Sequence, residues 1–163
     1  MNRIKFFLAA IALTFAVPTI GYTDEGRDAG LSMTQSTRVA SELATELDGC
    51  APLDKIFLAD CVRQALRRAA RQLSNNAAYW EAEVALARVA RNLDLLVRAN
   101  SDPDVSRIRA NGNRYRAMLP EKVGPITEVM RSALAQAESL IRQGSPGEIK
   151  HFAPIADAIK GRV

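Results

Sequence analysis

The chain has 163 residues, of which 48% are hydrophobic and 6% aromatic, and its formal charge is +4. This length supports one domain with a sizeable core, and the scarcity of aromatic residues and of β-branched runs argues against a sheet protein. The composition therefore predicts an all-α fold, which we expect to be a bundle of four or five antiparallel helices.

The N-terminus has the pattern of a secretory signal peptide. Two basic residues precede an apolar run at 6–17, and a proline follows it. Small residues end the segment, so we expect a signal peptide over 1–21 with cleavage after Gly21, and Thr23 is the fallback position. The run is a poor membrane span, and an uncleaved inner-membrane anchor is the alternative. The expected location is periplasmic or secreted.

Export changes the charge and the expected partners. Removal of Arg3 and Lys5 leaves 20 basic against 18 acidic residues, so the mature chain has a charge near +2. Seventeen of the 22 basic residues are arginine, which forms bidentate contacts with carboxylate and phosphate better than lysine does. The expected partner is another envelope protein or an acidic envelope polymer, and nucleic acid is not expected.

A flexible polar segment is expected over 22–31, followed by the helical-bundle domain over 32–163. The first helix is predicted at roughly 34–47, where Ala40, Leu43 and Leu47 recur at helical spacing and face inward. Gly49 follows this helix and is expected to end it in the left-handed conformation.

The next stretch combines two cysteines with a strongly amphipathic helix, which we expect to begin near Asp54 as the N-cap. Its arginines Arg63, Arg67 and Arg71 lie four residues apart, opposite the apolar face. Their like charges tolerate each other in solvent or beside an acidic partner. The apolar face comprises Leu58, Val62, Ala65, Leu66, Ala69 and Leu73.

Cys50 and Cys61 are the two cysteines of the chain, so they have one intramolecular pairing available. An oxidising compartment favours a disulfide, which requires Cα atoms within roughly 7 Å, so Cys50 is expected to fold back beside the helix. The closed loop of about 12 residues would stabilise the domain by roughly 3 kcal/mol. Two unpaired buried thiols are the alternative.

A third helix is predicted at roughly 77–99. Its inward seam comprises Tyr79, Ala82, Leu86, Val89, Leu93 and Leu96. Trp80, Val84 and Leu95 fall on the other side, among arginines that include Arg91. Two interpretations follow: the helix is central and buried on both sides, or Trp80, Val84 and Arg91 contact a partner.

Asp102 and Pro103 predict another helix start, and apolar residues keep an approximate heptad phase from there to Gln143. We expect either one long helix bent near its prolines, or a short basic helix and a long one divided at 111–113. The first section carries a second group of arginines, for which a solvated face is the ordinary explanation. These are Arg107, Arg109, Arg114 and Arg116.

The last element is a short helix at 148–160, or a pair of turns split by Pro154, docked by Phe152, Ile155 and Ile159. His151 is the sole histidine, and no pattern around it nominates a nucleophile. Its Glu-x-x-His spacing with Glu148 is that of carboxylate-bridged metal bundles, which need further inward carboxylates.

These patterns predict a non-catalytic binding or scaffold protein of the cell envelope, without a metal or cofactor. The predicted partner contacts are Arg63, Arg67, Arg71, Trp80, Val84 and Arg91. A haem- or metal-binding bundle that uses His151 is one alternative. A periplasmic chaperone is the other.

Overall fold

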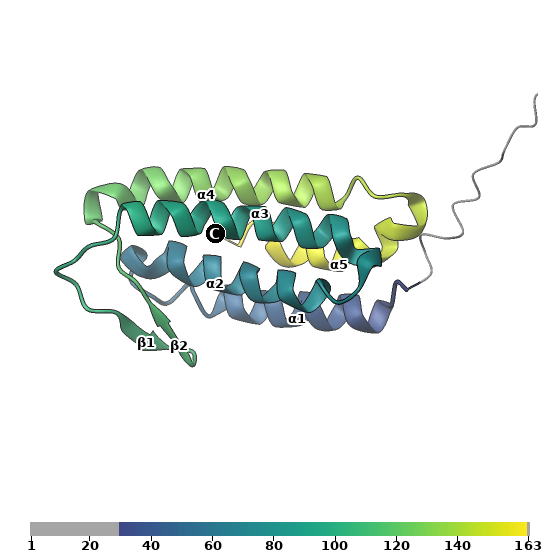
Figure 1. Ribbon diagram of the computed structural model, residues 1–163, viewed down its shortest axis with the longest axis horizontal. Coiled ribbons are helices and arrows are strands. Elements are labelled where there is room, and N and C mark those ends of the chain that lie inside the picture. The colour runs from purple at the N-terminus through teal and green to yellow at the C-terminus, as the bar shows by residue number, and fades with distance from the viewer. Residues whose placement is uncertain (1–29, 163) are drawn as a thin grey trace, which may run out of the picture.

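The computed structural model describes residues 30–162, and this part of the chain is mostly helical (Figure 1). The expected signal peptide at 1–21 and nearly all of the expected flexible segment at 22–31 lie outside the described residues. None of the helices within 30–162 combines the length and the apolar character that a membrane crossing requires.

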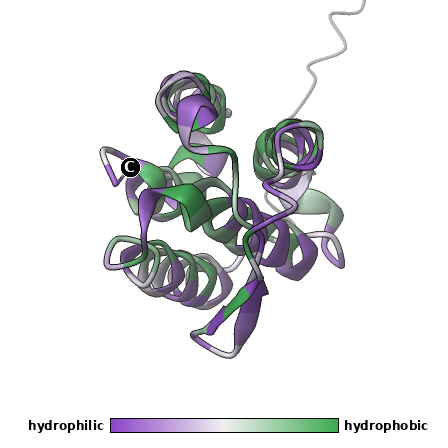
Figure 2. Ribbon diagram, turned by 90° about the vertical axis from the view of Figure 1, so that its left-hand side faces the viewer, coloured by the Kyte–Doolittle hydropathy of each residue, from purple (hydrophilic) through white to green (hydrophobic). Residues whose placement is uncertain are grey.

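The helices run along the long axis of the molecule, and a small hairpin projects near one end (Figure 1). Seen along that axis, the helices surround a shared interior (Figure 2). In chain order the elements are α1 (Met33–Asp48), α2 (Lys55–Leu73), the 3-10 turn η2 (Ala77–Tyr79), α3 (Trp80–Ala99), β1 (Ile108–Ala110), β2 (Asn113–Tyr115), α4 (Pro120–Ile141) and α5 (Pro146–Ile159).

The first helix matches its prediction closely, except at its end. Ala40, Leu43 and Leu47 are buried, as expected from their spacing. Gly49, however, has a φ of −67° and is therefore not left-handed. A Cβ at Gly49 would lie 2.9 Å from the Asn111 side-chain nitrogen, so a larger residue here would force that side chain and its hydrogen bond to the Gly49 carbonyl to shift.

The turn between α1 and α2 is closed by the predicted cysteine pair. Cys50 and Cys61 are joined, with their Cα atoms 5.7 Å apart, and both are buried. The predicted N-cap is also confirmed, because the Asp54 carboxylate accepts a hydrogen bond from the Ile56 N–H at the start of α2. The disulfide therefore fixes the turn covalently, and Asp54 caps the helix that follows it.

The third helix is buried on one side. Tyr79, Leu86 and Leu93 of its predicted seam are buried in the core. Trp80 and Leu95 are 62% and 63% exposed, so the interpretation of α3 as a central helix buried on both sides is wrong. The reason is that α3 packs against α2 and α4, which leaves its remaining side to solvent.

The largest departure from the predicted fold is the connection between α3 and α4, where we expected helix. β1 and β2 pair as an antiparallel hairpin, with Arg109 opposite Arg114. Asn111 and Gly112 form its two-residue turn, with φ values of 51° and 72°, and Asn-Gly is the preferred sequence for such a turn. Asp102 caps no helix; its carboxylate accepts a hydrogen bond from the Asp104 N–H.

The prolines act differently from the prediction. α4 begins at Pro120, where the missing N–H costs nothing, and it continues through Pro125. α5 likewise continues through Pro154, so the alternative of two separate turns is wrong. Its docking residues are confirmed, since Phe152, Ile155 and Ile159 are all buried in the core.

Candidate functional site

A groove of about 440 Å³ lies between α2 and α3, on the side of α2 that carries the arginines. Its floor includes Ala70 of α2 together with Ala87 and Ala90 of α3. These short side chains leave the space between the helices open, whereas long side chains stand at its rims. The charged lining residues are Arg63, Arg67 and Arg71 of α2 and Glu83, Arg91, Asp94 and Arg98 of α3.

Arg63 is held inside the protein by two carboxylates. Its side chain is only 14% exposed, and its Nε donates to Asp60 at 2.7 Å. Its terminal nitrogen lies 3.1 Å from the Asp94 carboxylate across the groove. Asp60 and Asp94 of the same chain therefore neutralise the charge of Arg63.

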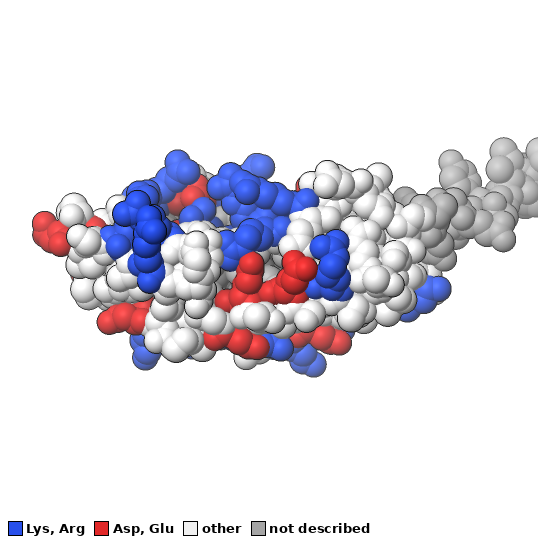
Figure 3. Space-filling view, turned by 90° about the horizontal axis from the view of Figure 1, so that it is seen from below, with Lys and Arg blue, Asp and Glu red and all other residues white. Residues whose placement is uncertain are grey.

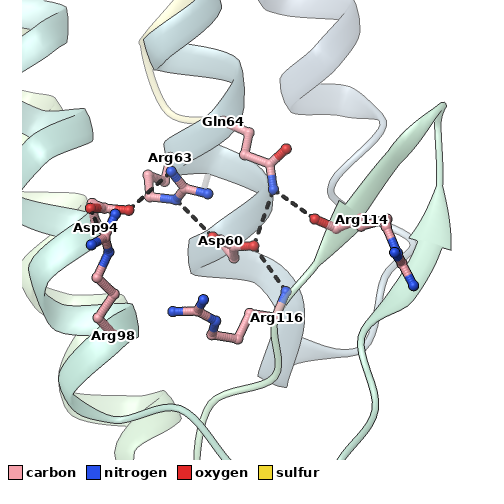
Figure 4. A network of polar contacts seen from close by, with 7 residues as sticks. All are labelled: Asp60, Arg63, Gln64, Asp94, Arg98, Arg114 and Arg116. Atoms are coloured by element: carbon pink, nitrogen blue, oxygen red, sulfur yellow. Dashed lines mark hydrogen bonds and ion pairs between the residues drawn. The ribbon is translucent and has the colours of Figure 1, made fainter.

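Asp60 is the centre of this network, drawn in Figure 4. The residue is 4% exposed, and its second carboxylate oxygen accepts from the Gln64 side chain at 3.1 Å and from the Arg116 N–H at 2.9 Å. A buried carboxylate is costly without such partners. The network therefore ties α2, through Asp60, to the segment after β2 and, through Arg63, to α3.

Arg67, Arg71 and Arg91 have a different environment. All three are exposed, and none forms an ion pair within residues 30–162. They line the same groove from its two sides, and Glu83 and Asp94 are the acidic residues beside them, of which Asp94 already binds Arg63 and Arg98. The groove therefore keeps an excess of positive charge without an internal partner.

The space-filling view in Figure 3 shows how the charges are distributed over one face of the molecule. Lysine and arginine side chains gather over one half of the length, with a short row of carboxylates beside them, and the other end is largely uncharged. On this face the basic side chains are therefore concentrated over part of the length.

The predicted strip of Trp80, Val84 and Arg91 does not form one surface. Arg91 lines the groove beside α2, whereas Trp80 and Val84 line a separate hollow of about 320 Å³ that also includes Leu140 of α4. Residues of α3 that share one broad side thus face two different neighbouring helices. The role of Trp80 and Val84 as partner contacts stays a prediction.

The hairpin is the feature that sequence reasoning missed. Asn111 donates to the Gly49 carbonyl at 2.8 Å, and Arg68 donates to the Asn113 side chain at 3.0 Å. The Gln64 side chain donates to the Arg114 carbonyl at 2.9 Å. The Asn111-Gly112 pair is the sequence signal that predicts this hairpin. The hairpin brings Arg114 close to Gln64 of α2, with Arg109 opposite Arg114.

Of the Glu-x-x-His pair of α5, Glu148 lies in a helix cap and His151 lies in the interior. The Glu148 carboxylate accepts from the Ser145 N–H at 2.7 Å, which completes a capping box at the start of α5. His151 is buried, and its Nδ1 has no hydrogen-bond partner in the described part of the chain. Within 30–162, no three His, Cys, Asp or Glu residues lie close enough together to hold a metal ion.

Comparisons with protein-family models, with curated proteins and with solved structures find no match to this chain. Its function must therefore be inferred from the geometry and charge of its own residues. The α2–α3 groove is the feature that brings the largest number of the predicted contact residues together, namely Arg63, Arg67, Arg71 and Arg91.

Proposed function

We propose that this protein is an exported, non-catalytic bundle of antiparallel helices that binds an acidic partner in the cell envelope through the α2–α3 groove. The observation that carries the proposal is the convergence of Arg67, Arg71 and Arg91 on one hollow, where none of them has an ion pair with a residue of 30–162. Guanidinium groups hydrogen-bond carboxylate and phosphate oxygens in a bidentate manner, so an anionic group in the groove would satisfy several donors at once.

The chemistry of the groove favours binding over catalysis. Its lining contains five arginines, two carboxylates, one serine and three alanines. Neither a thiol nor an imidazole is among them, so Ser74 has no neighbouring base of the kind that activates a hydroxyl nucleophile. The guanidinium groups of arginine donate hydrogen bonds and accept none, which suits them to binding an anion.

The proposed location is supported by two independent features. The N-terminal sequence has the basic, apolar and small-residue regions of an export signal. The cysteines Cys50 and Cys61 are paired and buried, as is typical of proteins from oxidising compartments. Together they favour the periplasm or the extracellular space.

The test is retention on a phosphate- or carboxylate-bearing matrix, measured as the salt concentration that elutes the protein. The triple variant Arg67→Gln, Arg71→Gln and Arg91→Gln is expected to elute at clearly lower salt than the wild type, because it lacks the three groove arginines that have no ion pair in the described part of the chain.

The matched control removes three exposed charges elsewhere, by Arg38→Gln on α1 together with Lys150→Gln and Lys160→Gln at α5. It has the same net charge as the groove variant and is expected to elute close to the wild type. Equal elution of the two triple variants would contradict the proposal, because retention would then depend on net charge alone.

A further inference from the structure

We infer that the hairpin extends the groove, and that the partner is an extended anionic polymer with repeating phosphate or carboxylate groups. This inference rests on the proposed function and adds to it a second contact site, formed by Arg109 and Arg114 of β1 and β2. The polymer would lie across both sites, with some of its charges in the groove and others on the outer face of the hairpin.

The two faces of the hairpin differ in the way that strand alternation predicts. Tyr115 is buried, and its partner Ile108 is partly buried, as are Ala110 and Asn113. Arg109 and Arg114 occupy the alternate positions, and both are exposed. One face therefore packs on the body of the protein, and the outer face consists of an arginine pair.

The arginine pair carries an electrostatic cost. Arg109 and Arg114 are directly opposite each other in the hairpin, an arrangement in which like charges destabilise strand pairing. Neither has an ion-pair partner in the described part of the chain. An anion bound between them would relieve the repulsion and gain two guanidinium contacts.

The outer face is held in a fixed direction. The tip is anchored through Asn111 to the turn that the disulfide closes, and β2 is anchored through Gln64 and Arg68 to α2. In Figure 4 the side chain of Arg114 points away from the helices. The pair is therefore presented to solvent on an ordered element, which lowers the entropic cost of binding.

The hairpin and the groove adjoin each other through the Asp60 network. The Gln64 amide donates both to Asp60 and to the Arg114 carbonyl. Asp60 in turn binds Arg63, which lines the groove. Gln64, which contacts β2, is one helical turn from Arg67, which lines the groove, so the hairpin contact and the groove adjoin each other along α2.

The composition of the two sites favours a polymer over a folded protein. Protein interfaces depend on buried aromatic and aliphatic anchors, whereas the groove is lined by five arginines, three alanines, one serine and two carboxylates, of which Asp94 is already paired. The exposed aromatic side chain, Trp80, lines the other hollow. Rows of separate arginines without apolar anchors suit a flexible chain of regularly spaced anions.

The experiment compares long and short anions on the purified protein, by calorimetry at fixed ionic strength. The probes are long-chain polyphosphate and inorganic tripolyphosphate, with poly-glutamate and free glutamate as the carboxylate arm. Whichever polymer binds more tightly identifies the anionic group. The variant Arg109→Gln/Arg114→Gln is expected to bind that polymer about 5- to 10-fold more weakly. Its affinity for the short anion is expected to fall much less, because only the polymer can contact the groove and the hairpin at the same time.

Two variants separate this inference from the proposed function. The groove triple variant is expected to lose affinity for both long and short anions, and the control Arg38→Gln/Lys150→Gln is expected to lose neither. Unchanged polymer binding by the hairpin variant, or an equal loss in the control, would overturn the hairpin site and leave the groove in place. Unchanged binding by the groove variant would instead overturn the proposed function. Binding of the wild type to neither polymer would also overturn the inference and point to a folded acidic protein as the partner.

Discussion

Three arginines with identical spacing on α2 have two different roles. Arg63 is largely buried and is paired with Asp60 on its own helix and Asp94 on α3. Arg67 and Arg71 are exposed and lack an ion pair within the described chain. The comparison separates the stripe by what each arginine faces: Arg63 meets the carboxylates of Asp60 and Asp94, whereas Arg67 and Arg71 have no carboxylate within ion-pair distance among the described residues.

The division has a consequence for mutational studies. Charges in the paired region are expected to affect stability because their partners are buried, and charges in the free region are expected to affect binding alone. Variants of Asp60 and of Arg67 and Arg71 test the two sides of this division, and variants of the disulfide and of the hairpin turn test the scaffold around them.

The largest effect is expected from removal of the disulfide. The double variant Cys50→Ala/Cys61→Ala should lose about 3 kcal/mol of unfolding free energy, because the unfolded chain gains conformational freedom. Urea denaturation monitored by circular dichroism measures the loss. Addition of reductant to the wild type should give a similar midpoint, and a midpoint unaffected by both changes would show that packing alone holds the α1–α2 turn.

Loss of the Asp60 carboxylate is expected to be next in size. Asp60→Ala should cost about 2 kcal/mol, because Gln64 and the Arg116 N–H lose their acceptor while Arg63 keeps Asp94. The control is Asp48→Ala, at an exposed end of α1, where the ion pair with Arg162 should contribute little. If the two variants had the same melting temperature, the buried Asp60 network would contribute no more to stability than an exposed ion pair does.

A change in the hairpin turn is expected to cause a smaller loss of unfolding free energy. Gly112→Ala should cost about 1 kcal/mol, because φ is 72° there although the space around it is open. Gly124→Ala is the control: it also has open space but lies within α4, where alanine should stabilise the helix by about 0.5–1 kcal/mol. Opposite shifts in thermal midpoint are expected, and a loss in both would argue against the turn.

The free arginines should have the smallest effect on stability. Arg67→Gln/Arg71→Gln is expected to change the unfolding free energy by less than about 0.5 kcal/mol, since both side chains are exposed and neither has an ion pair among the residues that the structure describes. The same denaturation experiment measures it. A loss comparable to that of Asp60→Ala would place these residues in the structural network and remove the distinction from Arg63.

The helices and the cysteine pair could be predicted because their signals are local or periodic. Leu43, Leu66 and Leu86 recur with their neighbours at helical spacing, and each is buried. The hairpin was missed because its strands are three residues long, too short for alternation to outweigh an apparent heptad phase. The Asn111-Gly112 turn was the stronger signal.

The candidate site could be predicted only in part. The outward direction of Arg67 and Arg71 follows from the periodicity of one helix. The contact of Arg63 with Asp94 depends on how α2 lies along α3, which a single helical pattern does not contain. The separation of Trp80 from Arg91 has the same origin, since it depends on which neighbouring helix each side of α3 meets.

The hydrogen bond from Asn111 to Gly49 joins positions 62 residues apart in the chain. Closing so long a loop costs more entropy than forming a helix or the hairpin turn, both of which use neighbouring residues. The hairpin is therefore expected to dock late in folding, after α1 and α2 have packed together.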